Sequence, residues 1–186
     1  MEILKMKRCT DGGDKYLGNA IAYVRPDKEG TVAVMGYGVD CYKPLHALGQ
    51  MRIVRKYFGK SAYNPLIHFI ICYDGCVLSV EEACRLTREI VADLAESYQM
   101  CIAIHNKDRD AAFYHAHVVM NAVSYKDGKL FHSGFSELNE ICRKVSDVTG
   151  RCCKLVIEES KKQDENKRFK KEDLEYFCAY CHKLTH

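Results

Sequence analysis

Three histidines in the middle of the sequence have the spacing of a metal site. His115 and His117 lie one residue apart in YHAHVVMN, whose apolar run is typical of a β-strand. Side chains alternate along a strand, so both imidazoles share one face. His105 ends the preceding apolar run, MCIAIHN, and joins them if the two runs pair as antiparallel strands. Three neutral imidazoles can bind a divalent transition metal and leave coordination positions open for a phosphate oxygen.

Three polar residues near these histidines are candidates for orienting them. Asp108 and Asp110 lie in the loop NKDRDAAF, and either carboxylate could accept the second ring N–H of a liganding histidine. Asn121 follows on the same face of the second strand, where its amide could orient a ligand or satisfy backbone groups. An HxH pair also occurs at structural or surface positions, and the third histidine on a second strand is what favours the metal site.

Composition sets limits without defining a function. The chain has 186 residues, 47% apolar and 28% charged, which fits one globular domain. The formal charge of +3 neither demands nor excludes a nucleic-acid partner. No apolar run is long enough for a transmembrane segment, and the N-terminal MEILKMKRC lacks the apolar core of a signal peptide. We therefore expect a cytoplasmic protein whose 11 cysteines are mostly buried and reduced.

The hydrophobic pattern predicts an α+β fold, with a central antiparallel β-sheet flanked by helices. Strands are expected at 1–6, 64–74, 100–106, 114–125 and 153–158, and a strand or loop at 31–39. Helices are expected at 12–24, 44–58, 79–98 and 135–149, the third opened by a capping box of Ser79 and Glu82. A turn at 126–128 follows the HxH strand. Residues 1–158 form the predicted catalytic domain, and the charged residues 159–186 a helical extension.

These segments together resemble the relaxase, or mobilisation nuclease, domain of plasmids and integrative conjugative elements, a MOBP-like branch of the HUH endonuclease superfamily. The shared pattern is a histidine, an acidic residue shortly after it, and HxH followed by apolar residues and asparagine, here HAHVVMNAVSY. AIAYVRPDKEG resembles the first motif of the family, a tyrosine with a proline and a lysine a few residues on. YGVDC, RKYFGK, IHFIICYDG, SVEEACRLTREIVADL and DGKLFHSG follow in the order of the family, and the resemblance covers roughly residues 1–155.

The resemblance implies a bacterial enzyme that nicks and rejoins one DNA strand at an origin of transfer, through a covalent 5′-phosphotyrosine. Tyr23 matches the nucleophile, with Tyr16 as the alternative, and Asp108, with Asp110 as the alternative, matches the catalytic acidic residue. His105, His115 and His117 match the ligands of a divalent cation, which is Mn²⁺, Mg²⁺ or Zn²⁺. The implied partners are single-stranded origin DNA with an adjacent hairpin, accessory relaxosome proteins and a coupling protein.

Two departures from the family pattern concern its motifs. The acidic residue usually lies two positions after the first histidine, whereas Asn106 and Lys107 precede Asp108 here, and the loop that leads to the HxH pair is longer than usual. The first motif lacks the customary threonine after its lysine. The first departure concerns the orienting acid and leaves the three ligands in place.

Basic residues are candidates for DNA contacts, because neutralising phosphates gives affinity that falls with salt. His68, in the strand LIHFIICYD, could touch the scissile phosphate or support a metal ligand, and is otherwise a structural histidine. The remaining candidates lie on one predicted helix and in the tail, and they are Arg52, Arg55, Lys56, Lys167, Arg168, Lys170 and Lys171.

Two alternatives stay open at this level. A related HUH replication initiator or transposase would use a C-terminal tyrosine, and Tyr176 and Tyr180 stand four residues apart in the tail. A non-catalytic DNA-binding module would use the histidines for a structural zinc ion. The CxxC pair of Cys178 and Cys181 with His182 also has zinc-type residues, but it lacks a second well-spaced half, and burial of both thiols is favoured.

Overall fold

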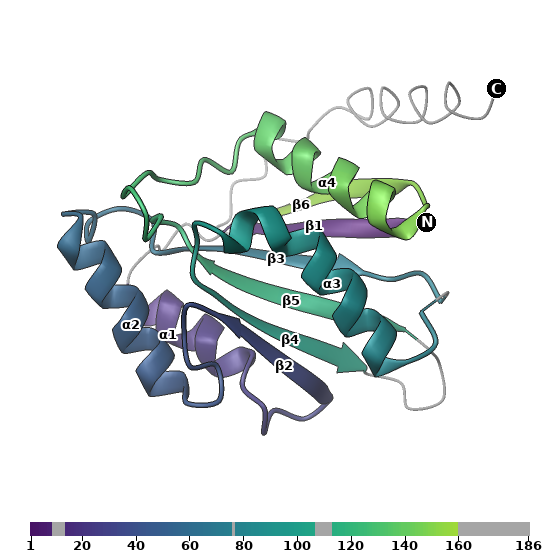
Figure 1. The fold of residues 1–186 in the computed structure, drawn as a ribbon, viewed down its shortest axis with the longest axis horizontal. Helices are drawn as coiled ribbons and strands as arrows, with labels where there is room; N and C mark the ends of the chain where they lie inside the picture. The colour runs from purple at the N-terminus through teal and green to yellow at the C-terminus, as the bar shows by residue number, and fades with distance from the viewer. Residues whose placement is uncertain (9–13, 76, 107–112, 160–186) are drawn as a thin grey trace.

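The computed structural model describes residues 1–8, 14–75, 77–106 and 113–159. Six strands and four helices form this part of the chain (Figure 1). The strands are β1 (Glu2–Arg8), β2 (Thr31–Tyr37), β3 (Leu66–Cys72), β4 (Met100–Asn106), β5 (Tyr114–Asn121) and β6 (Cys153–Glu159). The helices are α1 (Asp14–Tyr23), α2 (Pro44–Tyr57), α3 (Val80–Ala95) and α4 (Phe135–Thr149). Among these residues no helix has the length and apolar content needed to cross a bilayer.

All strands belong to one sheet, in the order β2-β4-β5-β3-β1-β6. The neighbouring strands are antiparallel, as the sequence predicts, except that β6 runs parallel to β1. The α+β prediction is confirmed, and the sheet is mixed rather than purely antiparallel. The exception arises because α4 carries the chain back to the end of the sheet where β1 begins, and the Glu2 amide there donates to the Cys152 carbonyl at 2.9 Å.

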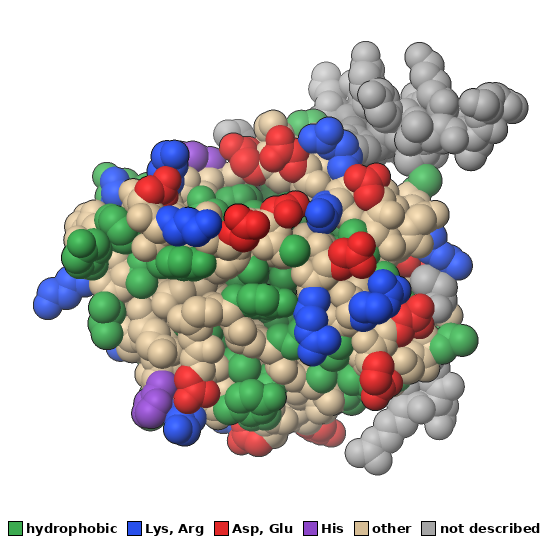
Figure 2. All heavy atoms as spheres, in the orientation of Figure 1, with side chains coloured by type: hydrophobic (Ala, Val, Ile, Leu, Met, Phe, Trp, Pro, Cys, Tyr) green, Lys and Arg blue, Asp and Glu red, His purple; other side chains and the backbone are tan. Residues whose placement is uncertain are grey.

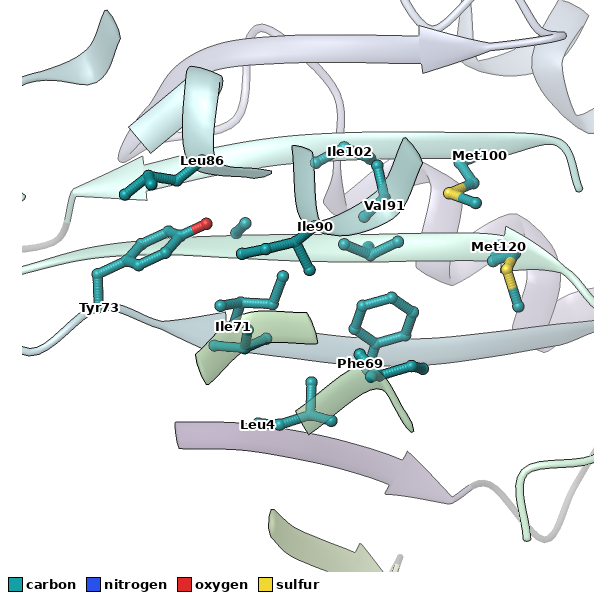
Figure 3. Close-up of a cluster of buried hydrophobic side chains, with 14 of the residues drawn as sticks. Leu4, Phe69, Ile71, Tyr73, Leu86, Ile90, Val91, Met100, Ile102 and Met120 are labelled. Atoms are coloured by element: carbon teal, nitrogen blue, oxygen red, sulfur yellow. The ribbon is translucent and has the colours of Figure 1, made fainter. Parts of the chain in front are cut away.

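Helices α3 and α4 cover one face of the sheet and enclose the larger core. The side chains of this core come from the alternate positions of β1, β3, β4 and β5 that face the two helices (Figure 3). Phe69, Ile71 and Ile102 are fully buried there, packed beneath Ile90 and Val91 of α3. This continuous apolar layer fixes the sheet, and the opposite face is therefore available for polar groups.

Helices α1 and α2 pack over part of the opposite face in a second, smaller core. Leu17 and Ile21 of α1 and Met51 of α2 are buried against Ala103 of β4 and Val119 of β5. This packing holds the C-terminal end of α1 over the strands that carry the histidines.

The start of α3 shows how local sequence sets an element boundary. The Ser79 hydroxyl accepts a hydrogen bond from the Glu82 amide at 3.1 Å, which is the predicted N-cap. The Glu82 carboxylate accepts from the Leu78 amide at 3.2 Å rather than from that of Ser79, so the reciprocal bond reaches one residue further back than in a standard capping box.

The outer surface of α3 and α4 carries acidic and basic side chains close together (Figure 2). Several of them form ion pairs, such as Lys144 with Asp93 at 3.0 Å and Arg85 with Glu89 at 3.3 Å. Mixed charges of this kind do not concentrate positive potential. This side of the molecule therefore lacks the uniform basic surface that a DNA backbone would select.

Truncation of the larger core gives a test of the fold. We expect Phe69→Ala to lower the free energy of unfolding by about 3–5 kcal/mol, because it leaves a cavity beneath α3. The exposed Leu45 on α2 is a matched control, and Leu45→Ala should change stability by less than about 0.5 kcal/mol. Urea unfolding followed by circular dichroism measures both, and equal effects would contradict this assignment of the core.

Candidate functional site

The pairing of β4 with β5 brings the three predicted ligands together. His105 lies directly opposite His115, and His117 is two cross-strand pairs further along, opposite Ala103. One potential ligand atom from each histidine lies within 4.8 Å of those of the other two. The ring centroids of His105 and His117 are 4.6 Å apart, and those of His115 and His117 are 5.1 Å apart. The predicted convergence of His105, His115 and His117 is thus present in the fold.

Burial favours the uncharged form of the His117 imidazole. Burial lowers the pKa of His117 to about 2, with further lowering from the neighbouring His105, His68, His115 and Lys7. His105 and His117 are almost fully buried, whereas His115 is partly exposed. Neutral imidazoles keep a lone pair for coordination, and three such nitrogens clustered with one partly exposed ring fit a divalent transition metal that keeps an open position.

His68 supports this cluster from the neighbouring strand β3. Its Nε2 lies 3.4 Å from Nδ1 of His117, and its side chain is buried. Burial and the charge of Lys7 lower the pKa of His68 to about 4, so it is also neutral. Nε2 of His68 and Nδ1 of His117 then share one proton in a hydrogen bond. The other ring nitrogen of His117, Nε2, is therefore available to a cation. Of the two roles considered from the sequence, this placement favours support of a metal ligand over a DNA contact.

Tyr23, the expected nucleophile, lies beside the histidine cluster. It is the last residue of α1, and its ring centroid is 4.9 Å from that of His117 and 5.4 Å from that of His105. The side chain is partly exposed, so a substrate can reach it. Tyr16, the alternative, is also partly buried on α1 and packs against the smaller core.

Thr31 is a further neighbour of the cluster that the sequence did not indicate. It lies opposite His105 at the start of β2, and its Oγ1 is 3.1 Å from Nε2 of His105. The contact depends on a register shift between Thr31 and Ala33. The sequence predicts a strand or loop at 31–39 and does not indicate which strand it pairs with. The contact between Thr31 and His105 could therefore not be predicted.

The other predicted site residues within the described part of the chain lie away from the histidines. The Asn121 amide donates to the Met51 carbonyl at 3.2 Å and to the Gln99 side chain at 3.0 Å, which matches the backbone-satisfying role rather than contact with a ligand. Arg55 is 3% exposed, and its Nη2 donates to the Ser61 carbonyl at 2.6 Å.

The expected DNA contact at Arg55 therefore needs correction, because this guanidinium is buried and donates to backbone carbonyls of the segment that follows α2. Arg52 and Lys56 are exposed on the same helix. The remaining predicted residues lie outside the described part of the chain, and they are Asp108, Asp110, Lys167, Arg168, Lys170, Lys171, Tyr176, Tyr180, Cys178, Cys181 and His182.

The protein is thus an α+β protein with three clustered histidines that could hold a metal ion and a tyrosine ring beside them. The chain matches the family model described as "Relaxase: MobA/VirD2-like, nuclease domain" over residues 16–150, which contain Tyr23 and all three histidines. It therefore belongs to the MobA/VirD2-like relaxase nuclease family, whose domain nicks DNA for mobilisation. Searches of curated proteins and of solved structures gave no match.

Removal of one ligand tests the metal site. We expect His117→Ala to abolish tight binding of Mn²⁺, because two histidines cannot complete the site. His46 is 64% exposed and lies outside the cluster, so His46→Ala should bind Mn²⁺ as the unmodified protein does. Isothermal titration measures both affinities, and undiminished binding by His117→Ala would exclude the triad as the site.

Loss of the supporting histidine should weaken the site without destroying it. We expect His68→Ala to lower Mn²⁺ affinity about 10- to 100-fold, since His117 loses the partner that fixes its tautomer. His68→Gln retains a polar group at that place and should recover part of the affinity. Equal affinities for these two variants and the unmodified protein would show that His68 only fills space.

Proposed function

We propose that this protein nicks and rejoins single-stranded DNA at an origin of transfer, with Tyr23 as the nucleophile. The observation that carries the proposal is the position of the Tyr23 ring within 5.4 Å of two histidine rings of the triad, those of His105 and His117, measured between centroids. A phenol needs no such neighbours for packing alone, since Leu17 and Ile21 already fill the core beneath α1. A structural zinc site would likewise not require a partly exposed tyrosine.

In the proposed reaction the Tyr23 oxygen attacks the phosphorus of the scissile phosphodiester. The new P–O bond to tyrosine forms as the bond to the 3′ oxygen breaks, the phenolic proton passes to solvent, and the leaving oxygen takes up a proton. A divalent cation, when bound, supplies charge that stabilises the non-bridging oxygens. His105, His115 and His117 hold that ion, and His68 and Thr31 orient two of those rings.

The phosphotyrosine preserves the energy of the original diester, because one phosphodiester bond replaces another. The reverse attack by a 3′ hydroxyl therefore rejoins the strand without a nucleotide cofactor. Within this proposal the partners are origin DNA with an adjacent hairpin, accessory relaxosome proteins and a coupling protein. The proposed cation is Mn²⁺ or Mg²⁺, with Zn²⁺ as the further option.

A covalent adduct tests the proposed function. The protein is incubated with Mn²⁺ and a pool of random-sequence, 5′-labelled and 3′-labelled single-stranded oligonucleotides, and the products are separated under denaturing conditions. We expect a protease-sensitive adduct that carries the 3′ label, because the 5′ phosphate of the downstream fragment is attached to tyrosine. Sequencing of the adduct DNA then identifies the nick site.

Matched tyrosine variants identify the nucleophile. Tyr23→Phe should abolish the adduct, since it removes one oxygen and leaves the ring packing intact. Tyr16→Phe, on the same helix, should form it at the normal rate. An adduct that survives Tyr23→Phe and is lost in Tyr176→Phe would instead identify the C-terminal nucleophile of an initiator or transposase.

A further inference from the structure

A lysine from the first strand also lies at the site, although no motif of the sequence pointed to it. Lys7 is directly opposite His68 in the pairing of β1 with β3, and therefore points to the histidine face of the sheet. Its Nζ lies 5.8 Å from the centroid of the Tyr23 ring. The Nζ of Lys28, which follows α1, lies 5.6 Å from the same centroid. Two ammonium groups thus flank the expected nucleophile.

The charge of Lys7 acts on the histidine cluster as well. It contributes to the lowered pKa of both His68 and His117, after the larger effect of burial. These are unfavourable neighbours for an ammonium group, because neutral imidazoles beside a cation offer no compensating charge. A divalent ion on the triad would add to the repulsion.

No carboxylate within the described part of the chain forms an ion pair with Lys7. Glu158 of β6 lies opposite Lys7 in the β1–β6 pairing, but its carboxylate pairs with Lys5 at 3.9 Å instead. Lys7 is nevertheless partly buried. A partly buried ammonium beside the histidine cluster, for which the described residues supply no counter-ion, is arranged to meet an anion supplied by a ligand.

We propose that Lys7 contacts a non-bridging oxygen of the phosphodiester that Tyr23 attacks, and so is a catalytic residue of this site. The inference rests on the proposed function and adds a group to it. During attack the phosphate gains negative charge, so a lysine at this place stabilises the transition state more than the bound substrate. Lys28 supplies the second positive charge beside the ring of Tyr23.

A merely structural role would give a different result. Lys7 could hold the Tyr23 ring by a cation–π contact alone, or could be an ordinary solvated lysine on a strand. In the first case loss of the cation slows the reaction without affecting how DNA binds, and Lys7→Arg, which keeps a cation over the ring, restores the rate. In the second case Lys7 behaves as Lys5 does, which shares its strand and its face of the sheet.

The test compares Lys7→Gln, Lys7→Arg and the matched control Lys5→Gln in two measurements. The first is the single-turnover rate of adduct formation with Mn²⁺ and the oligonucleotide pool. We expect Lys7→Gln to slow this rate about 10²-fold, Lys7→Arg to recover most of it, and Lys5→Gln to stay within about two-fold of the unmodified protein.

The second measurement does not depend on cleavage. The same three changes are combined with Tyr23→Phe, and binding of single-stranded oligo-dT with Mn²⁺ is followed by fluorescence anisotropy as salt is raised. Loss of one phosphate contact should reduce the slope of log affinity against log salt by about 0.7 for Lys7→Gln. The slope for Lys5→Gln should equal that of Tyr23→Phe alone.

The two measurements separate the possible outcomes. A slower rate together with a reduced slope supports the proposal. A slower rate with an unchanged slope would overturn it in favour of positioning Tyr23, and a reduced slope with a normal rate would place the contact at another phosphate. Similar behaviour of Lys7→Gln and Lys5→Gln would overturn it outright. If the unmodified protein forms no adduct, the proposed function fails, and the slope alone decides whether Lys7 contacts DNA phosphate.

Discussion

Histidine rings from three neighbouring strands lie together on one face of the sheet, and the buried rings of His68 and His117 must remain uncharged. Protonation of either would bury a cation among other imidazoles and beside Lys7, and the lowered pKa values of His117 and His68, about 2 and about 4, express this constraint. Neutral imidazoles with fixed orientations are what a divalent cation requires. The site is therefore arranged for a metal ion before one binds, and the rest of the fold serves to maintain that arrangement.

The two faces of the sheet have different roles in this arrangement. Helices α3 and α4 bury the larger apolar core, which fixes the register of β4, β5 and β3 and thus the spacing of the histidines. On the other face α1 packs over small residues of β4 and β5, such as Ala103, and its C-terminal residue Tyr23 lies beside the rings. The proposed metal ligands thus come from strands, whereas the proposed nucleophile comes from the end of a helix and is partly exposed.

Much of this arrangement could be predicted from the sequence, because it depends on local periodicity. The alternation around His115 and His117 gave the shared face, and the apolar run that ends at His105 gave the second strand. Contacts that depend on strand order could not be predicted. Lys7 reaches the site only because β1 pairs with β3, and Thr31 only because β2 shifts its register against β4. Arg55 looked like a surface cation because its carbonyl partners, those of Ser61 and Tyr63, lie in the segment after the helix, which periodicity does not describe.

The account depends on one cation held by the three imidazoles next to the phenol of Tyr23. A crystal structure of the protein with Mn²⁺, with the ion located by its anomalous scattering, tests this most directly. The account predicts a single strong peak at bonding distance from one nitrogen each of His105, His115 and His117, on the side of the rings that faces Tyr23. A peak at any other group of residues, or rings of the triad that turn away from one another in the presence of the metal, would contradict it.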